Sequence, residues 1–224
     1  MSSRPWPRNM NESGAKSGAR WIASGLLVAG LCSCRQALPP GEYLSAYEKA
    51  ALQTFEMGEY TVRLLYQSPD YVVARELKAG ADPREAKSLG ERFADGIYVA
   101  VSISPKEIQG TPEDLSRDFL NSSLRDGEAA FRDKLTYLQG GLRGKVRLLD
   151  ASKKPVPPST YNFTRNFGMG KANTFLFAFP ARSDGKSLDV RDLEIVIEDF
   201  GLNSGTLRTR LKYPGSLALR VNHE

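Results

Sequence analysis

Alternating apolar and polar positions are the clearest pattern in the chain, and they predict β-strands. Every second residue is apolar or aromatic from Ile97 to Ile103, and the same period of two runs from Tyr60 to Tyr66. This spacing places the apolar side chains on one face of a strand. The two patterns predict strands at residues 59–67 and 96–104. Past residue 140, short segments separated by Gly- and Pro-containing turns predict six more, at 143–150, 160–167, 173–180, 190–199, 206–213 and 216–221.

Apolar residues spaced by three and four positions predict a helix from Tyr43 to Met57, with Gly58 as its stop. Later helices begin with a Ser, Asp or Thr directly before a proline, because the side-chain oxygen caps a free N–H and proline has none to lose. These starts predict helices near 69–79, 83–95 and 112–139, the last with a break at Asp126–Gly127. The N-terminal part of this last helix carries the acids Glu113, Asp114 and Asp118, and the helix dipole favours acids near a helix start.

The order of these elements predicts an α+β fold. Residues 43–139 are rich in helices and residues 140–224 are rich in strands. Several short alternating strands with tight turns are typical of a β-sandwich. We therefore expect N-terminal helices packed against a mainly antiparallel, immunoglobulin-like β-sandwich.

The strand predicted at 206–213 carries three basic residues on one face, an arrangement that by itself suggests an anion-binding stripe. A hairpin with 190–199 offers an alternative, because one register places Glu198 opposite Arg208 and Glu194 opposite Lys212. Opposite charges across strands stabilise a sheet by about 0.2–1 kcal/mol per pair. We expect a self-paired, solvated face.

Aromatic residues alternate along the strands predicted at 160–167 and 173–180, which favours a sandwich core. The alternative is an apolar groove for an acyl chain or for a hydrophobic segment of a partner. Arg165 shares the parity of the aromatic residues and is placed to stack on a ring. With Asn166 and Phe167, it is the candidate ligand or partner contact.

The N-terminal segment has the organisation of a secretory signal. Residues 1–20 carry four basic residues and one acid, and residues 21–31 are apolar or small. This apolar run is about half the length of a membrane span. It is followed by Leu31-Cys32-Ser33-Cys34, which resembles the lipobox of bacterial lipoproteins, with an aliphatic residue three positions before the cysteine and a small residue directly before it.

This resemblance implies that Cys34 receives the lipid anchor and becomes the first residue of the mature protein. Residues 1–33 are then the signal peptide, 34–42 a short lipid-anchored tether, and 43–224 a single globular domain. Arg35 follows the cysteine, where enterobacterial lipoproteins retained in the inner membrane carry Asp. The resemblance therefore implies an outer-membrane lipoprotein that faces the periplasm.

Removal of the leader changes what the composition indicates. The full chain has a net charge of +5, but residues 34–224 hold 27 basic and 25 acidic residues, a net charge of +2. This balance argues against nucleic-acid binding. The lipid occupies the only cysteine left, and the only histidine, His223, is next to the last residue. We therefore predict no catalytic residue, metal site or cofactor, although a hydrolase that uses two carboxylates stays open.

Together these observations favour a non-enzymatic, lipid-anchored envelope protein, an interaction or structural module near the outer membrane. The alternative is a periplasmic carrier or binder of a hydrophobic or lipid ligand. A continuous cavity lined by the aromatic strands would distinguish the carrier.

Overall fold

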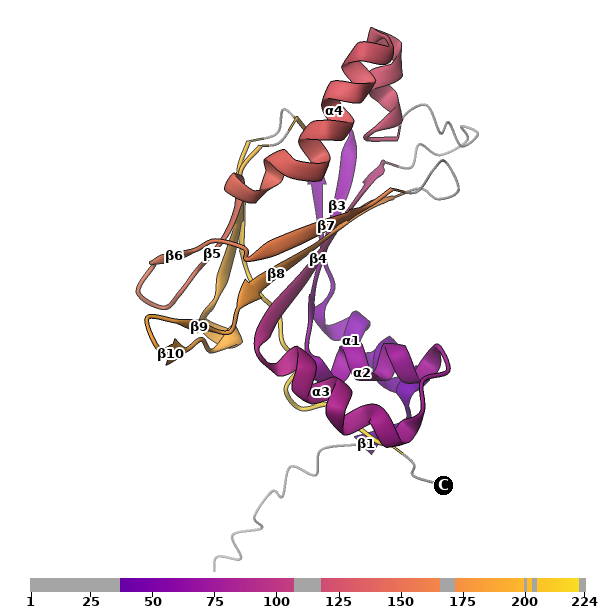
Figure 1. Ribbon diagram of the computed structural model, residues 1–224, viewed down its shortest axis with the longest axis vertical. Coiled ribbons are helices and arrows are strands. Elements are labelled where there is room, and N and C mark those ends of the chain that lie inside the picture. The colour runs from indigo at the N-terminus through magenta and orange to yellow at the C-terminus, as the bar shows by residue number, and fades with distance from the viewer. Residues whose placement is uncertain (1–36, 107–117, 166–171, 200, 203–204, 222–224) are drawn as a thin grey trace, which may run out of the picture. The chain divides into compact units, whose positions relative to one another are not determined.

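The computed structural model describes residues 37–106, 118–165, 172–199, 201–202 and 205–221. A five-stranded antiparallel sheet runs through this part of the chain (Figure 1). Its strand order is β2 (Gln53–Met57), β3 (Tyr60–Gln67), β4 (Gly96–Pro105), β8 (Asn173–Pro180) and β7 (Thr160–Thr164). The period-two patterns of the sequence correspond to β3 and β4, which pair from Tyr60–Pro105 to Gln67–Tyr98.

A second, four-stranded antiparallel sheet has the order β12 (Leu207–Arg210), β11 (Glu194–Ile197), β5 (Val146–Leu149) and β6 (Pro155–Val156). Two short pairs complete the strands: β9 (Arg182–Ser183) with β10 (Lys186–Ser187), and β1 (Ala37–Leu38) with β13 (Ala218–Leu219). The pair β1–β13 is parallel and joins the first described residues to the last described segment.

Helices gather at the two ends of the five-stranded sheet (Figure 1). At one end lie α1 (Pro40–Ala51), α2 (Pro69–Lys78), η1 (Pro83–Glu85) and α3 (Ala86–Ala94). At the other lie η3 (Asn121–Asp126), α4 (Glu128–Gly140) and η4 (Gly141–Gly144), while η5 (Val190–Asp192) precedes β11. The predicted break before α4 is present: Gly127 has a φ of 101°, which a residue with a Cβ rarely adopts.

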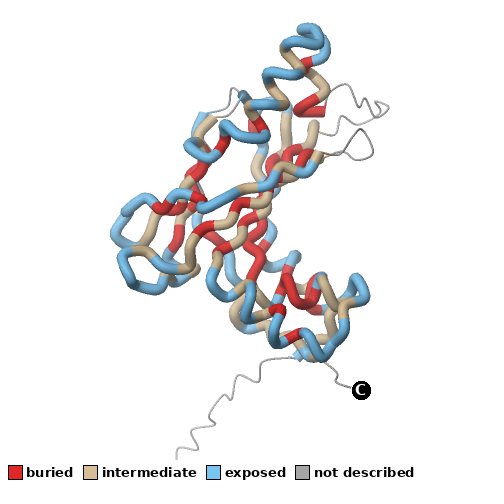
Figure 2. Tube along the Cα trace, in the orientation of Figure 1, coloured by how far each residue is buried: buried red, intermediate tan, exposed pale blue. Residues whose placement is uncertain are grey.

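One hydrophobic core is shared by the two sheets. Val99 and Phe177 of the first sheet and Leu148 and Ile195 of the second belong to the same buried cluster. Buried residues therefore follow the strands through the middle of the domain in Figure 2. Two smaller clusters lie among the helices, one between α1 and α2 and one between α2 and α3.

The predicted helix from Tyr43 to Met57 is wrong in its second half. The helix ends at Ala51, and Gln53–Met57 forms the edge strand β2. Gly58, with a φ of 59°, turns the chain so that β2 pairs with β3 from Gln53–Leu64 to Met57–Tyr60. Phe55, which matched the helical spacing, faces Val62 across this pair.

The helix also begins earlier than predicted, at Pro40, and Ala37 and Leu38 are already in a strand. The proposed tether 34–42 therefore contains ordered structure from Ala37 onwards. The reason is long-range, because β1 exists only through its pairing with Ala218 and Leu219, about 180 residues later.

The predicted mixture of helices and antiparallel sheets is confirmed. The immunoglobulin-like part of the description stays a prediction.

Candidate functional site

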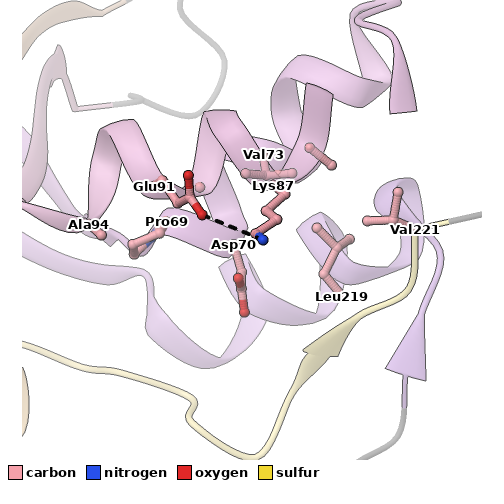
Figure 3. A pocket seen from close by; sticks show the side chains of 10 residues that line it. Pro69, Asp70, Val73, Lys87, Glu91, Ala94, Leu219 and Val221 are labelled. Atoms are coloured by element: carbon pink, nitrogen blue, oxygen red, sulfur yellow. Dashed lines mark ion pairs between the residues drawn. The ribbon is translucent and has the colours of Figure 1, made fainter. Parts of the chain in front are cut away.

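An open groove of about 460 Å³ lies between α2, α3 and β13 (Figure 3). Its apolar lining comes from three places in the sequence: the start of α2, the whole length of α3, and the last described strand. These residues are Pro69, Val73, Ala86, Gly90, Ala94, Leu219 and Val221. No local sequence pattern joins them, so the sequence analysis did not find this groove.

The sequence builds the walls of the groove locally. Ser68 caps α2 by accepting the backbone N–H of Tyr71 at 3.2 Å, and Pro69 occupies the first turn, as the Ser-Pro pair predicts. On α3, Gly90 faces the groove without a side chain, and a Cβ there would meet Val73 Cγ2 at 3.8 Å. The absence of a side chain at Gly90 keeps the middle of the groove open.

Three charged residues stand at the rim of the groove: Asp70, Lys87 and Glu91. Lys87 and Glu91 are one helical turn apart on α3, with Nζ 4.0 Å from Oε1. Their side chains are 89% and 68% exposed, so this pair contributes little to stability. Both side chains are therefore available to a ligand at the rim.

The candidate contact at Arg165 lies on a different part of the domain. The guanidinium carbon of Arg165 is 5.1 Å from the ring centroid of Phe131 in α4. The sequence pattern predicted that Arg165 stacks on an aromatic ring without identifying the ring, and the ring that it contacts belongs to a helix. Asn166 and Phe167 lie outside the described residues, so the role of the segment in ligand or partner contact stays a prediction.

The aromatic strands β7 and β8 contribute to the core. Phe175, Phe177 and Phe179 are at most 2% exposed. Phe163 stacks on Phe175 with ring centroids 4.8 Å apart, and Tyr161 stacks on Phe177 at 5.3 Å. These rings fill the interior between the sheets, and the groove lies at the helical end instead.

The basic face of β12 is self-paired, but in a register two residues away from the predicted one. Arg208 lies opposite Val196, not opposite Glu198. Its guanidinium binds Glu194, with Nε 2.6 Å from Oε2, while Glu198 pairs with Arg147 of β5. A shift of two keeps every side chain on its face, which is why the pattern indicated the face correctly and the partners wrongly.

These ion pairs determine how the two carboxylates titrate. Hydrogen bonds from Lys153 and Arg208 lower the pKa of Glu194. The bond from Arg147 does the same for Glu198, with Lys145 as a further cation nearby. A general acid needs a raised pKa, so neither Glu194 nor Glu198 has the pKa expected of the acid in a pair of hydrolytic carboxylates.

Asp118 has a different role from the one predicted. It is 2% exposed, and its Oδ1 accepts the backbone N–H groups of Leu120 and Asn121 at 3.0 Å each. Its Oδ2 accepts the side-chain amide of Asn173 on β8 at 2.5 Å. Glu113 and Asp114 lie outside the described residues. The carboxylate of Asp118 thus joins the turn before η3 to the central sheet.

A cluster of tyrosines between α1, α2 and β3 was also missed by the sequence analysis. Tyr47 is fully buried, and its ring centroid lies 5.8 Å from that of Tyr43 and 5.0 Å from that of Tyr71. Tyr71 donates its hydroxyl to Glu48 at 2.7 Å. Burial raises the pKa of Tyr43 to about 12 and raises the pKa of Tyr47 further. Their spacing along α1 was visible in the sequence as apolar periodicity only.

The residues that the structure describes contain neither a metal-binding cluster nor a membrane-spanning helix. Across the ranges that the structure describes, no group of three or more His, Cys, Asp and Glu residues is arranged to hold a metal ion. Among the helices of those same ranges, none combines the length and the apolar character that a membrane crossing requires.

No protein-family model matches the chain, and no curated protein is significantly similar to it. Two solved structures are similar at 13% sequence identity. One is a novel protein of unknown function from Burkholderia pseudomallei, with a TM-score of 0.35 over 81% of this chain and 96% of that one. The other is a DUF4426 family protein from Pseudomonas aeruginosa, with a TM-score of 0.33 over 73% of this chain and 94% of that one.

Proposed function

We propose that the protein is a bacterial lipoprotein, anchored through Cys34, whose domain serves as an interaction or structural module at the periplasmic side of the outer membrane. The observation that carries the proposal is the distance along the chain between Cys34 and the first strand. Ala37, which pairs with Ala218, is the third residue after Cys34. Three residues extend over about 10 Å, so a lipid on Cys34 would keep β1 close to the bilayer.

The helical end is then the part of the domain nearest to the membrane. The strand β1 leads directly into α1, and β13 contacts both α1 and α2. Tyr43 and Leu44 of α1 are buried in the cluster that α1 and α2 share. A short link to a packed helix restricts the orientations that the domain can take, as expected of a module that meets its partners at a membrane surface.

An immunoglobulin-like sandwich is part of the same proposal. Its support is the single buried cluster to which both antiparallel sheets contribute. The carrier alternative rested on the aromatic strands, whose rings are packed against one another, so we retain the anchored module as the proposed function.

Metabolic labelling with an acyl analogue tests the anchor. The full chain is expressed in a bacterial host, and labelling of the wild type is compared with that of Cys34→Ala. Cys32→Ala is the matched control, since it removes a cysteine two residues away and leaves the lipobox cysteine in place. We expect label on the wild type and on Cys32→Ala and none on Cys34→Ala. Equal labelling of both variants would refute the anchor assignment.

A further inference from the structure

The groove between α2, α3 and β13 is the uncovered side of the third hydrophobic cluster. Val73, Ala86 and Leu89 form the buried part of this cluster. Leu219 and Val221 pack against it and are only partly buried. The groove therefore presents a narrow apolar floor to solvent, and filling it with apolar groups would be favourable.

The chain places this groove close to the proposed anchor. Leu219, which lines the groove, is the register partner of Leu38 in the β1–β13 pair. Leu38 is the fourth residue after Cys34, so the chain between the anchor and the strand beside the groove can span at most about 13 Å. If Cys34 carries a lipid, the acyl chains of the bilayer lie within reach of the groove.

The charges at the rim restrict the head group that fits above the apolar floor. Asp70 and Glu91 contribute two negative charges and Lys87 one positive charge. An anionic head group would meet a rim of net negative charge. A zwitterionic head group is complementary, because its phosphate can pair with Lys87 and its ammonium with a carboxylate.

We propose that the groove binds an acyl chain of a phospholipid with a zwitterionic head group, drawn from the membrane that carries the protein. This inference rests on the proposed lipid anchor for its source of lipid. Figure 3 shows the arrangement on which it depends, with the side chains of Val73, Leu219 and Val221 at the apolar floor and Asp70, Lys87 and Glu91 at the rim. Binding of a lipid chain would fix the helical end against the bilayer.

A single tryptophan in the lining of the groove provides the test. Both tryptophans of the chain, Trp6 and Trp21, precede Cys34. The full chain with Trp6→Phe and Trp21→Phe is expressed in a bacterial host, purified from its membranes and placed in phosphatidylethanolamine vesicles with brominated acyl chains. One variant adds Val221→Trp, which places the probe in the lining of the groove and keeps the three charged residues of the rim, and the matched control adds Arg92→Trp, an exposed position of α3 outside the groove.

We expect bromine to quench Trp at position 221 more than Trp at position 92. Adding Gly90→Leu should remove the difference, because the new side chain passes Val73 at ordinary contact distance and fills the groove. Ala94→Leu serves the same purpose from the end of α3 should the first variant fail to fold. Equal quenching at the two positions, or quenching unchanged by both blocking variants, would overturn the proposal.

A second arm separates this inference from the anchor. Short-chain phosphatidylethanolamine is added as monomers, and the fluorescence of Trp at position 221 reports binding without a bilayer. Each pair of methylenes removed from the chain should weaken binding about tenfold. Phosphatidylglycerol of equal chain length should bind less tightly, and equal affinity would contradict the role of the rim.

The mass of the N-terminal peptide reports the lipid on Cys34 independently. Bound monomers with an unmodified Cys34 would support the groove and refute the anchor. A lipidated Cys34 with no monomer binding and equal quenching would support the anchor and refute the groove.

Discussion

Replacement of Tyr47 by phenylalanine is the sharpest test of the packing at the helical end. Tyr47 is fully buried, and its Oη has no hydrogen-bond partner in the structure. The hydroxyl of Ser68 is a polar neighbour that accepts the N–H of Tyr71 at 3.2 Å, and its lowering effect on the pKa of Tyr47 is outweighed by burial. A buried polar group without a partner costs about 1–3 kcal/mol relative to its hydrated state. Tyr47→Phe should therefore stabilise the domain.

The magnitude follows from what the substitution keeps and what it removes. The ring stays against Tyr43 and Tyr71, so its aromatic contacts are retained. The lost oxygen gives up several atom contacts of about 0.1–0.2 kcal/mol each. We expect a net gain of about 1 kcal/mol in the free energy of unfolding, which raises the Tm of a domain of this size by about 2–4 °C.

Urea and thermal unfolding followed by far-UV circular dichroism provide the assay. Tyr71→Phe is the matched control, since it removes the same atom from a ring that donates to Glu48 at 2.7 Å. Loss of a hydrogen bond to a carboxylate should destabilise the domain by about 1–2 kcal/mol. The two variants thus move in opposite directions. Destabilisation by Tyr47→Phe would refute the reasoning and would mean that Ser68 or a water molecule satisfies the hydroxyl.

Two further predictions concern other buried polar groups. Burial raises the pKa of Tyr43 to about 12, whereas an unfolded tyrosine titrates near 10. The folded state therefore binds this proton more tightly than the unfolded state does. The contribution of Tyr43 to the free energy of unfolding should be fully present below about pH 10 and should be lost as the pH rises through about 12. The urea midpoint should fall over this range while the absorbance of phenolate at 295 nm rises, and an unchanged midpoint would contradict the prediction. Asp118→Ala should destabilise the domain by about 3 kcal/mol or more, because the N–H groups of Leu120 and Asn121 and the side-chain amide of Asn173 lose their acceptor. Asp118→Asn, which keeps Oδ1 as an acceptor, should recover much of this loss in the same urea assay, and equal losses for the two variants would argue against the bonding assigned to Oδ1.

The local pattern of the sequence was sufficient to predict several elements. The period of two located β3, β4 and β8, because burial on one face of a strand requires alternate apolar residues. The Ser-Pro pair located the start of α2, and Asp126–Gly127 located the break before α4. In each case the physical cause lies within a few residues of the element that it determines.

Other features depended on partners far away in the chain. Residues Gln53–Met57 fit the spacing of a helix, and only pairing with β3 makes them a strand. The register of β12 against β11 differed from the predicted one by two residues, a shift that leaves both faces unchanged and so leaves no mark in the hydrophobic pattern. Asp118 fits the acidic N-terminal part of a helix, yet its carboxylate binds an amide 55 residues away.

The sequence by itself determined which faces of the strands are buried, where α2 and η1 begin, and the resemblance of Leu31–Cys34 to a lipobox, because each depends on neighbouring residues alone. The tertiary structure decided which strands pair, in which register, and that Val73, Gly90 and Leu219 line one groove. These outcomes depend on the packing of segments up to about 180 residues apart, and no local pattern records that packing.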